Sequence, residues 1–150
     1  VEEFENMIAN DEFLEHAGYV NNMYGTPKRY VLDKLNAGEN VILEIEMQGG
    51  LQIKEKYPDA VLIFMAPPSA YTLKKRLVDR NTEEQDVINK RLARAAEEID
   101  YIDKYDYLVI NDELETCIND IQRIVTSEKN KVNNQPAMVD FIKKDFKNII

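Results

Sequence analysis

Residues 41–66 read VILEIEMQGGLQIKEKYPDAVLIFMA, and this stretch decides the fold. Its two ends, 41–45 and 61–66, are continuous apolar runs rich in β-branched residues, which predict buried strands. The segment between them predicts a helix that ends near Lys56. Strands that alternate with helices of this length predict an α/β fold with a parallel sheet and right-handed crossovers. Continuous apolar strands further predict that both faces of that sheet are covered.

The chain before this stretch predicts two helices around a small β segment. The first helix, the hairpin or irregular β segment and the second helix are expected over residues 2–10, 13–24 and 27–37. Thr26 is expected to cap the second helix, with Pro27 at its first position. Gly38 is expected to end it, because glycine adopts the left-handed backbone conformation that terminates helices.

The chain after this stretch continues the alternation of helices and strands. Helices are expected over residues 69–79, 82–104 and 113–130, and a third strand over 107–110. Ser69 is the expected cap of the first helix, and Thr82 with Gln85 has the spacing of a capping box. An amphipathic end helix, expected to pack on its own domain, carries apolar residues four apart: Met138, Ile142 and Phe146.

Composition excludes several classes of protein. The 150 residues are 44% hydrophobic and 31% charged, which suits a folded domain rather than a disordered tail. The formal net charge of −9 argues against a general nucleic-acid binder, which needs a basic face. One cysteine and one histidine exclude a disulfide framework and a Cys/His zinc site. The sequence has no apolar run of membrane-spanning length and no signal peptide, so we expect a cytoplasmic location and no membrane partner.

Two carboxylates, Glu44 and Glu46, follow the first predicted strand of the sheet. Ligands of open α/β sheets bind at the carboxyl ends of the strands. These acids could therefore hold the hydration shell of a metal ion or accept hydrogen bonds from a base. The alternative is that both are solvated acids in a loop.

Arginines cluster on the predicted helices that follow Pro68. Arg76 and Arg80 lie four residues apart on one helix, and Arg91 lies on the next. Guanidinium groups on a helical hairpin can close over phosphates, whose oxygens they match in geometry. The alternative is a solvated charged surface, in which Arg94 pairs with Glu98 at i, i+4.

A third set of residues, Glu15, Tyr24 and Thr26, lies in the small β segment. A carboxylate can accept hydrogen bonds from the adjacent N–H groups of a guanine edge, and hydroxyls can hold a phosphate. A structural turn is the alternative.

None of the glycines is followed by Lys-Ser or Lys-Thr, so these 150 residues contain no Walker A phosphate-binding loop.

Together these segments resemble guanylate kinase in order and spacing, over about residues 1–129. The stretches that carry the resemblance are EFLEHAGYVNNMYGTP (12–27), VILEIEMQGGLQIKEKYPDAVLIFMAPPS (41–69), LKKRLVDRNTEEQDVINKRL (73–92) and DYLVIND (106–112). The resemblance implies phosphoryl transfer from ATP to GMP, with Mg²⁺. It implies a P-loop kinase-type fold with a three-layer parallel-sheet core, a small GMP-binding subdomain and a helical lid. The expected division is 1–30 in the GMP-binding subdomain, 31–75 in the core, 76–100 in the lid, and 101–150 in the core and C-terminal helices.

The resemblance also implies roles for individual residues. Glu15 matches the guanine-reading carboxylate, and Tyr24 and Thr26 match hydroxyls that hold the GMP phosphate. Glu44 and Glu46 match acids near GMP and the metal, with Glu46 where the family often carries aspartate. The remaining matches are three catalytic arginines and one residue at the adenine end of the ATP site: Arg76, Arg80, Arg91 and Asn111.

The resemblance has one large departure from the family pattern. The family's first strand, its P-loop, the following helix and two GMP-phosphate arginines would lie before Val1. We therefore expect a guanylate kinase-like domain without its N-terminal portion, inactive by itself, as a monomer or homodimer. The alternatives are a guanylate kinase-like module that binds phosphorylated peptides without catalysis, and a different nucleoside monophosphate kinase. The pocket expected around Glu15 and Tyr24 argues against AMP or pyrimidine acceptors.

Overall fold

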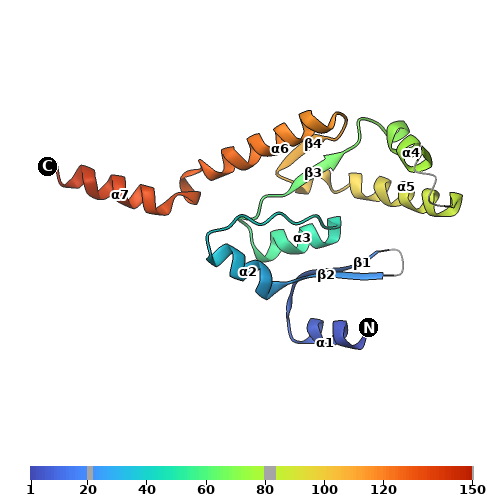
Figure 1. Cartoon of the computed structure of the whole chain (residues 1–150), viewed down its shortest axis with the longest axis horizontal. Coiled ribbons are helices and arrows are strands. Elements are labelled where there is room, and N and C mark those ends of the chain that lie inside the picture. The colour runs from blue at the N-terminus through green and yellow to red at the C-terminus, as the bar shows by residue number, and fades with distance from the viewer. Residues whose placement is uncertain (20–21, 80–83, 150) are drawn as a thin grey trace. The chain divides into compact units, whose positions relative to one another are not determined.

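The structure, a computed structural model, describes residues 1–19, 22–79 and 84–149 (Figure 1). Its helices are α1 (Glu2–Ala9), α2 (Lys28–Asn36), α3 (Met47–Lys56), α4 (Ala70–Asp79), α5 (Gln85–Ile99), α6 (Leu114–Lys129) and α7 (Pro136–Lys147), with short 3-10 helices η1 (Ile102–Lys104) and η2 (Val132–Asn134). Its strands are β1 (Phe13–Tyr19), β2 (Asn22–Pro27), β3 (Ile63–Ala66) and β4 (Tyr107–Ile110). The chain divides into two compact units: unit 1 is Val1–Phe64 with Ala93–Tyr107, and unit 2 is Met65–Leu92 with Leu108–Ile150.

In unit 1, β1 and β2 pair as an antiparallel hairpin, as the sequence predicts (Figure 1). The expected helix cap at Thr26 and Pro27 is wrong, because both residues end β2 and α2 begins at Lys28. The hydroxyl of Thr26 is bonded across the hairpin to Glu15 instead of to the start of the helix. The other end of α2 is as predicted, with Gly38 at φ +78°, the left-handed region that favours glycine.

The core of unit 1 lies between the hairpin, α2 and α3. Three buried side chains form its centre, and partly buried apolar side chains from residues 41–60 pack against them: Leu14, Val31 and Ile53, with Val41, Leu43, Ile45, Tyr57 and Ala60. Helix α3 contacts β1 along this core. Burial of these side chains supplies the main stabilising free energy of the unit, because apolar area removed from water dominates folding.

The strand predicted over residues 41–45 is wrong. These residues belong to no strand, although their side chains alternate as in an extended segment. Leu43 packs on the core, whereas Ile42 is 80% exposed. A strand also needs a neighbouring backbone for its N–H and C=O groups, and within the described residues no strand is hydrogen-bonded to this segment.

Strands β3 and β4 pair as the sequence predicts, in parallel. The carbonyl of Leu62 accepts from the N–H of Tyr107 at 3.1 Å, and the carbonyl of Ala66 accepts from Asn111 at 2.8 Å. Acceptor and donor both advance by four residues, so the two strands run in the same direction. The expectation that both faces are covered is wrong, because apolar side chains on this strand pair are about half exposed: Met65, Leu108 and Ile110.

The helices that follow β3 keep the predicted pattern with one correction. Ser69 caps α4, with its Oγ accepting from the N–H of Thr72 at 3.1 Å. Helix α5 ends at Ile99 instead of continuing to 104, where η1 follows as a separate turn. The capping box at the start of α5 depends on Thr82, which lies outside the described residues.

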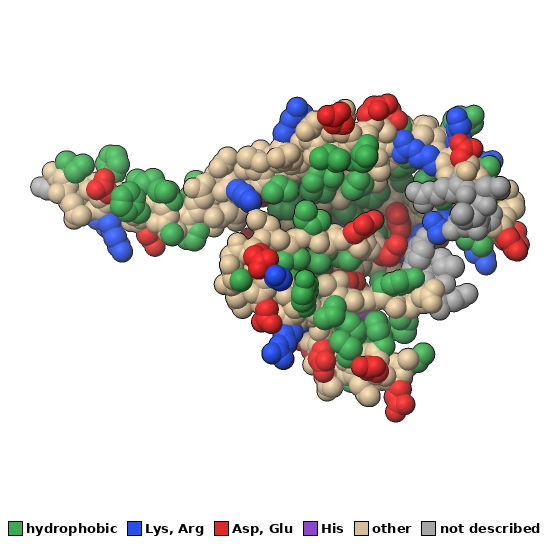
Figure 2. All heavy atoms as spheres, viewed as in Figure 1, with side chains coloured by type: hydrophobic (Ala, Val, Ile, Leu, Met, Phe, Trp, Pro, Cys, Tyr) green, Lys and Arg blue, Asp and Glu red, His purple; other side chains and the backbone are tan. Residues whose placement is uncertain are grey.

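The C-terminal helix α7 does not pack on its own domain as expected. It buries none of its residues, and its apolar side chains are about half exposed or more, as Figure 2 shows along this helix: Met138, Phe141, Ile142 and Phe146. The amphipathic pattern therefore predicts the helix correctly but not a covering partner within this chain. Among the described residues, no helix is both long and apolar enough to cross a membrane.

Candidate functional site

A buried carboxylate, Glu15, lies near the middle of β1 in unit 1 and is 3% exposed. The hairpin register places Thr26 directly opposite. The Thr26 hydroxyl donates to Glu15 Oε1 at 2.6 Å, the length of a charge-assisted O–H···O bond. The sequence named both residues for one site, and the structure brings them together.

Helix α3 closes over this carboxylate through a glycine. A Cβ atom at Gly49 would lie 2.9 Å from Cδ of Glu15 and closer still to its Oε2. Three residues later, Gln52 clamps the same strand, donating to the carbonyl of His16 at 2.8 Å and accepting from its N–H at 3.3 Å. Neither residue is predicted from the sequence as part of the site. The available signal was the Gly49-Gly50 pair, since glycine inside a helix costs about 1 kcal/mol relative to alanine and needs a packing reason.

The geometry around Glu15 suits recognition of a paired N–H edge. An ionised carboxylate only accepts hydrogen bonds, with about four lone-pair positions over its two oxygens, and Thr26 occupies one of them. Tyr24 lies two residues before Thr26 on β2, so the two side chains share a face of the strand. Tyr24 is 53% exposed, which leaves it accessible to a ligand.

The acid pair predicted at 44 and 46 divides into an exposed and a partly buried member. Glu44 is exposed, and Glu46 is the N-terminal cap residue of α3 but makes no capping hydrogen bond with its side chain. Its negative charge is one of the causes that raise the pKa of Glu98, a residue of α5 far along the chain. The sequence does not predict this interaction.

Glu98 forms an ion pair with Arg94, four residues earlier on α5. Arg94 Nε donates to Glu98 Oε1 at 3.1 Å, which confirms the i, i+4 pair that the sequence offered as the alternative interpretation of these residues. Burial raises the pKa of Glu98, the negative charge of Glu46 raises it further, and Arg94 opposes both effects. Tyr105 lies nearby, and its pKa is raised by burial and by the same two carboxylates.

Unit 2 carries the remaining predicted residues. Arg76 of α4 donates from Nη1 to the carbonyl of Asn111 at 2.6 Å and from Nη2 to the carbonyl of Asp112 at 3.4 Å. Two residues assigned to catalysis and to the ATP site are therefore in direct contact at the end of β4. Arg91 is partly buried on α5, and Arg80 lies outside the described residues.

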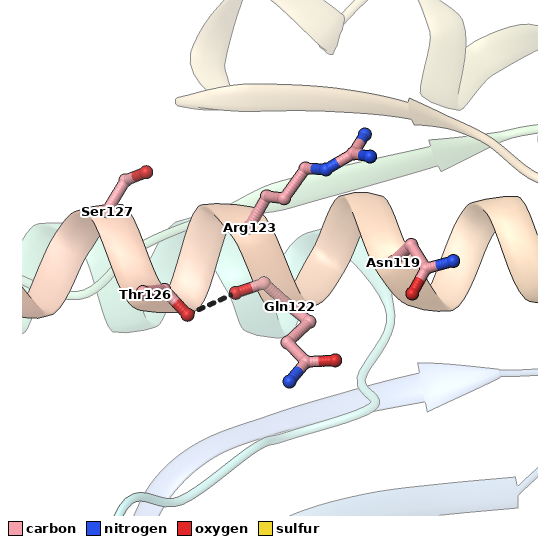
Figure 3. A pocket seen from close by; sticks show the side chains of 5 residues that line it. All are labelled: Asn119, Gln122, Arg123, Thr126 and Ser127. Carbon is pink, nitrogen blue, oxygen red and sulfur yellow. Dashed lines mark hydrogen bonds between the residues drawn. The ribbon is translucent and has the colours of Figure 1, made fainter.

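Neither a surface hollow nor a metal cage is found at the predicted site residues within the described part of the chain. A surface hollow of about 300 Å³ runs along α6 and is lined by polar side chains of that helix (Figure 3): Asn119, Gln122, Arg123, Thr126 and Ser127. In the described part of the chain, no three acidic, histidine or cysteine side chains form a metal cage. Mg²⁺ is commonly held by one or two carboxylates plus substrate phosphates, so such a cage is not required.

Comparison with known proteins finds guanylate kinases by sequence and by family model. A family model for guanylate kinase matches residues 1–128. The guanylate kinase of Latilactobacillus sakei is 47% identical over 143 residues, which cover 95% of this chain and 69% of the relative. The guanylate kinase of Carboxydothermus hydrogenoformans is 49% identical over 130 residues, which cover 87% of this chain and 64% of the relative. The chain thus spans about two thirds of the length of these relatives.

A solved structure shares the fold. The crystal structure of guanylate kinase from Anaplasma phagocytophilum aligns with a TM-score of 0.80 and 30% sequence identity. The alignment covers 97% of this chain and 71% of that one. The predicted α/β fold class is confirmed by this match.

Proposed function

The chain belongs to the guanylate kinase family, and we propose that its protein is an ATP:GMP phosphotransferase, a nucleoside monophosphate kinase that makes GDP. The observation that carries the proposal is the buried Glu15 carboxylate, bonded to Thr26 and enclosed by Gly49. A carboxylate fixed in this way accepts from the adjacent N–H groups of guanine. It would face the acceptor nitrogen of adenine unfavourably, because a buried acceptor opposite an acceptor stays unsatisfied.

The phosphate end of GMP is assigned to hydroxyls and acids of unit 1. Tyr24 is proposed to donate toward the phosphate, and Glu44 and Glu46 to lie near GMP. Thr26, whose one hydroxyl proton is donated to Glu15, is proposed to meet the phosphate as the family match implies only by exchanging that bond for one to a phosphate oxygen. Mg²⁺ would enter with ATP and neutralise charge on its phosphates. The exposed carboxylate of Glu44 is the side chain we expect to meet the hydration shell of the ion, since Glu46 is partly buried.

The arginines are proposed to stabilise the transferring phosphoryl group. Phosphoryl transfer asks a protein mainly for positioning and positive charge, and one arginine contributes on the order of 10³ to 10⁵ in rate. Arg80 and Arg91 are assigned this role with Arg76, which would exchange its carbonyl partners for phosphate oxygens. Asn111 is assigned to the adenine end of the ATP site.

These 150 residues by themselves are expected to turn over little GMP. They contain no Walker A loop to hold the donor phosphates, so arginines alone cannot assemble the transition state. The cytoplasmic location and the monomeric or homodimeric state expected from the sequence remain predictions.

The proposed function is tested by nucleotide binding to this chain. Calorimetric titration with GMP and with AMP should show a preference for GMP that Glu15→Gln removes, because an amide cannot accept from two adjacent N–H groups with both of its heavy atoms. Glu12→Gln, at an exposed acid three residues before Glu15, is the matched control and should keep the preference. Equal affinity of the unaltered chain for GMP and AMP would refute the assignment of Glu15.

A further inference from the structure

We propose that Gln52 and Lys56 of α3 are positioning residues for the guanine-reading carboxylate, because they hold the backbone of β1 on either side of Glu15. This inference rests on the proposed function and adds to it two residues that have no assigned contact with GMP. The geometry combines an open edge of β1, two side chains that α3 places along that edge, and an irregular step in the hairpin at Leu14.

The edge of β1 that faces away from β2 has no neighbouring strand among the described residues, because β1 and β2 form a two-stranded sheet. In an antiparallel pair, alternate residues direct their N–H and C=O groups away from the partner strand. Backbone groups at such an edge have to be satisfied by something other than a strand. His16, opposite Gly25 in the register, is one of these residues, since its N–H and its C=O are both bonded by a side chain of α3.

Helix α3 places two side chains along this edge, one on each side of Glu15. Gln52 donates from Nε2 to the carbonyl of His16 at 2.8 Å and accepts from the N–H of His16 at 3.3 Å. Lys56 donates from Nζ to the carbonyl of Leu14 at 3.1 Å. Gln52 and Lys56 are four residues apart and therefore share a face of the helix. The helix thus supplies hydrogen bonds that a further strand would otherwise make, at the two residues that flank the acid.

The hairpin is irregular at the residue before Glu15. The register gains one residue on β1 between Phe13 and Glu15, which makes Leu14 the extra residue of a β-bulge. Leu14 and Glu15 are both buried, at 4% and 3% exposure, although consecutive residues of a regular strand point to opposite faces. A bulge leaves its extra residue outside the ladder and re-aims the side chains beside it. The bond from Lys56 therefore fixes the bulge, and the bonds from Gln52 fix the residue that follows the acid.

The same helix carries the glycine against which the carboxylate lies. Gly49 is three residues before Gln52, and its missing Cβ leaves room for Glu15. Leu14 and Ile53 share the apolar core of the unit, but apolar burial is non-directional, whereas a hydrogen bond weakens steeply when it is misaligned. The polar bonds therefore determine where the carboxylate lies along α3. A ligand that depends on two hydrogen bonds to that carboxylate gains from having it held in place before binding.

The experiment compares Gln52→Met, Lys56→Met and Lys56→Arg in this chain. Methionine keeps a long side chain but donates no hydrogen bond. We expect each methionine variant to weaken GMP binding about tenfold by calorimetry, the size of one net hydrogen bond, and to leave AMP binding nearly unchanged. Lys56→Arg should retain most of the affinity for GMP, because a guanidinium group still donates to the Leu14 carbonyl. A general loss of positive charge at 56 would instead weaken both nucleotides equally, since both carry the same phosphate.

Gln48 provides a matched control for Gln52. It is a glutamine of the same helix, one turn earlier, and it is exposed. A general effect of replacing a helical glutamine by methionine should appear at both positions, and an effect through the His16 backbone only at 52. The side-chain carboxyl resonance of Glu15, observed with ¹³C-labelled glutamate and assigned by its loss in Glu15→Gln, should shift in Gln52→Met before any ligand is added. It should stay in place in Gln48→Met.

The outcomes separate the two proposals. An unaltered chain that binds GMP no more tightly than AMP would overturn the proposed function and this inference with it. A full preference for GMP in folded Gln52→Met or Lys56→Met would overturn the positioning role of that residue alone, as would an equal loss in Gln48→Met for Gln52. Should Gln52→Met fail to fold, Gln52→Asn decides, because it keeps the amide but shortens its reach to the His16 backbone, and its preference for GMP is expected to fall as well.

Discussion

The contact between α3 and Glu15 predicts a large effect from adding one methyl group. In Gly49→Ala the new Cβ would lie 2.9 Å from Cδ and 3.2 Å from Cγ of Glu15, nearer than nonbonded carbon atoms approach. The acid has little room to move away, because it is buried and bonded to Thr26. The methyl group must therefore displace the carboxylate or the start of the helix.

The neighbouring glycine supplies the reference for the magnitude. Both glycines lie in α3 and are buried, so alanine at either position gains about 0.5–1 kcal/mol of helix propensity. At Gly50 the new Cβ would meet Tyr105 at 3.6 Å and Leu62 at 3.9 Å, which is ordinary van der Waals contact. Overpacking of a filled interior costs about 1–3 kcal/mol, and that cost arises only at 49. We expect Gly50→Ala to be neutral or slightly stabilising and Gly49→Ala to be about 1–3 kcal/mol less stable than Gly50→Ala.

Urea denaturation followed by circular dichroism measures the difference directly. The two midpoints should separate at equal slope, and GMP binding should be weakened in Gly49→Ala and retained in Gly50→Ala. Equal free energies of unfolding for the two variants would refute the claim that Gly49 is required by Glu15. Unchanged preference for GMP over AMP in Gly49→Ala would show that guanine recognition does not depend on where this carboxylate lies.

Two further predictions concern stability. Ser69→Ala removes the Oγ that accepts from the N–H of Thr72, so it should lower the free energy of unfolding by about 1 kcal/mol. Urea denaturation measures the difference, and an unchanged free energy of unfolding would contradict a stabilising role for this cap. The folded-state pKa of Glu98 is raised above its ordinary value of 4.5, so its contribution to stability is fully present below pH 4.5 and is lost as the pH rises through the folded pKa. Denaturation of the unaltered chain and of Glu98→Gln between pH 4 and 8 should show a smaller decline with pH in the variant, and parallel curves would contradict the assignment.

The sequence predicts most of the helices, strands and turns, because each of them depends mainly on residues close together in the chain. The Ser69 cap and the Gly38 terminus depend on residues within one turn of each other, and the hairpin joins two strands that are neighbours in the chain; all three are present. The strand expected at 41–45 fails because apolar content does not specify a hydrogen-bonding neighbour. The same limit applies to α7, whose apolar stripe predicts the helix but cannot state what covers it.

The candidate site divides in the same way. Glu15 and Thr26 could be named from the resemblance, and the hairpin explains why they meet. Gly49 and Gln52 could not be named, because each acts by contact with a residue on another element. Their roles follow from tertiary packing: a missing Cβ beside Glu15 and a clamp on the His16 backbone.

Arg76 shows why a motif and a contact have to be weighed together. The sequence assigned it to phosphate, and in the structure it donates to the carbonyls of Asn111 and Asp112. These carbonyls are neutral acceptors, and the one charged partner of Arg76, the exposed carboxylate of Asp112, lies 3.5 Å from Nη2. Hydrogen bonds from a guanidinium to a phosphate are stronger than those to a carbonyl, because both groups are charged. A phosphate within reach would therefore compete successfully for the same N–H groups. In its absence the carbonyls satisfy the guanidinium and hold α4 against the end of β4, so the observed contacts are compatible with the catalytic proposal and define the state from which Arg76 would have to move.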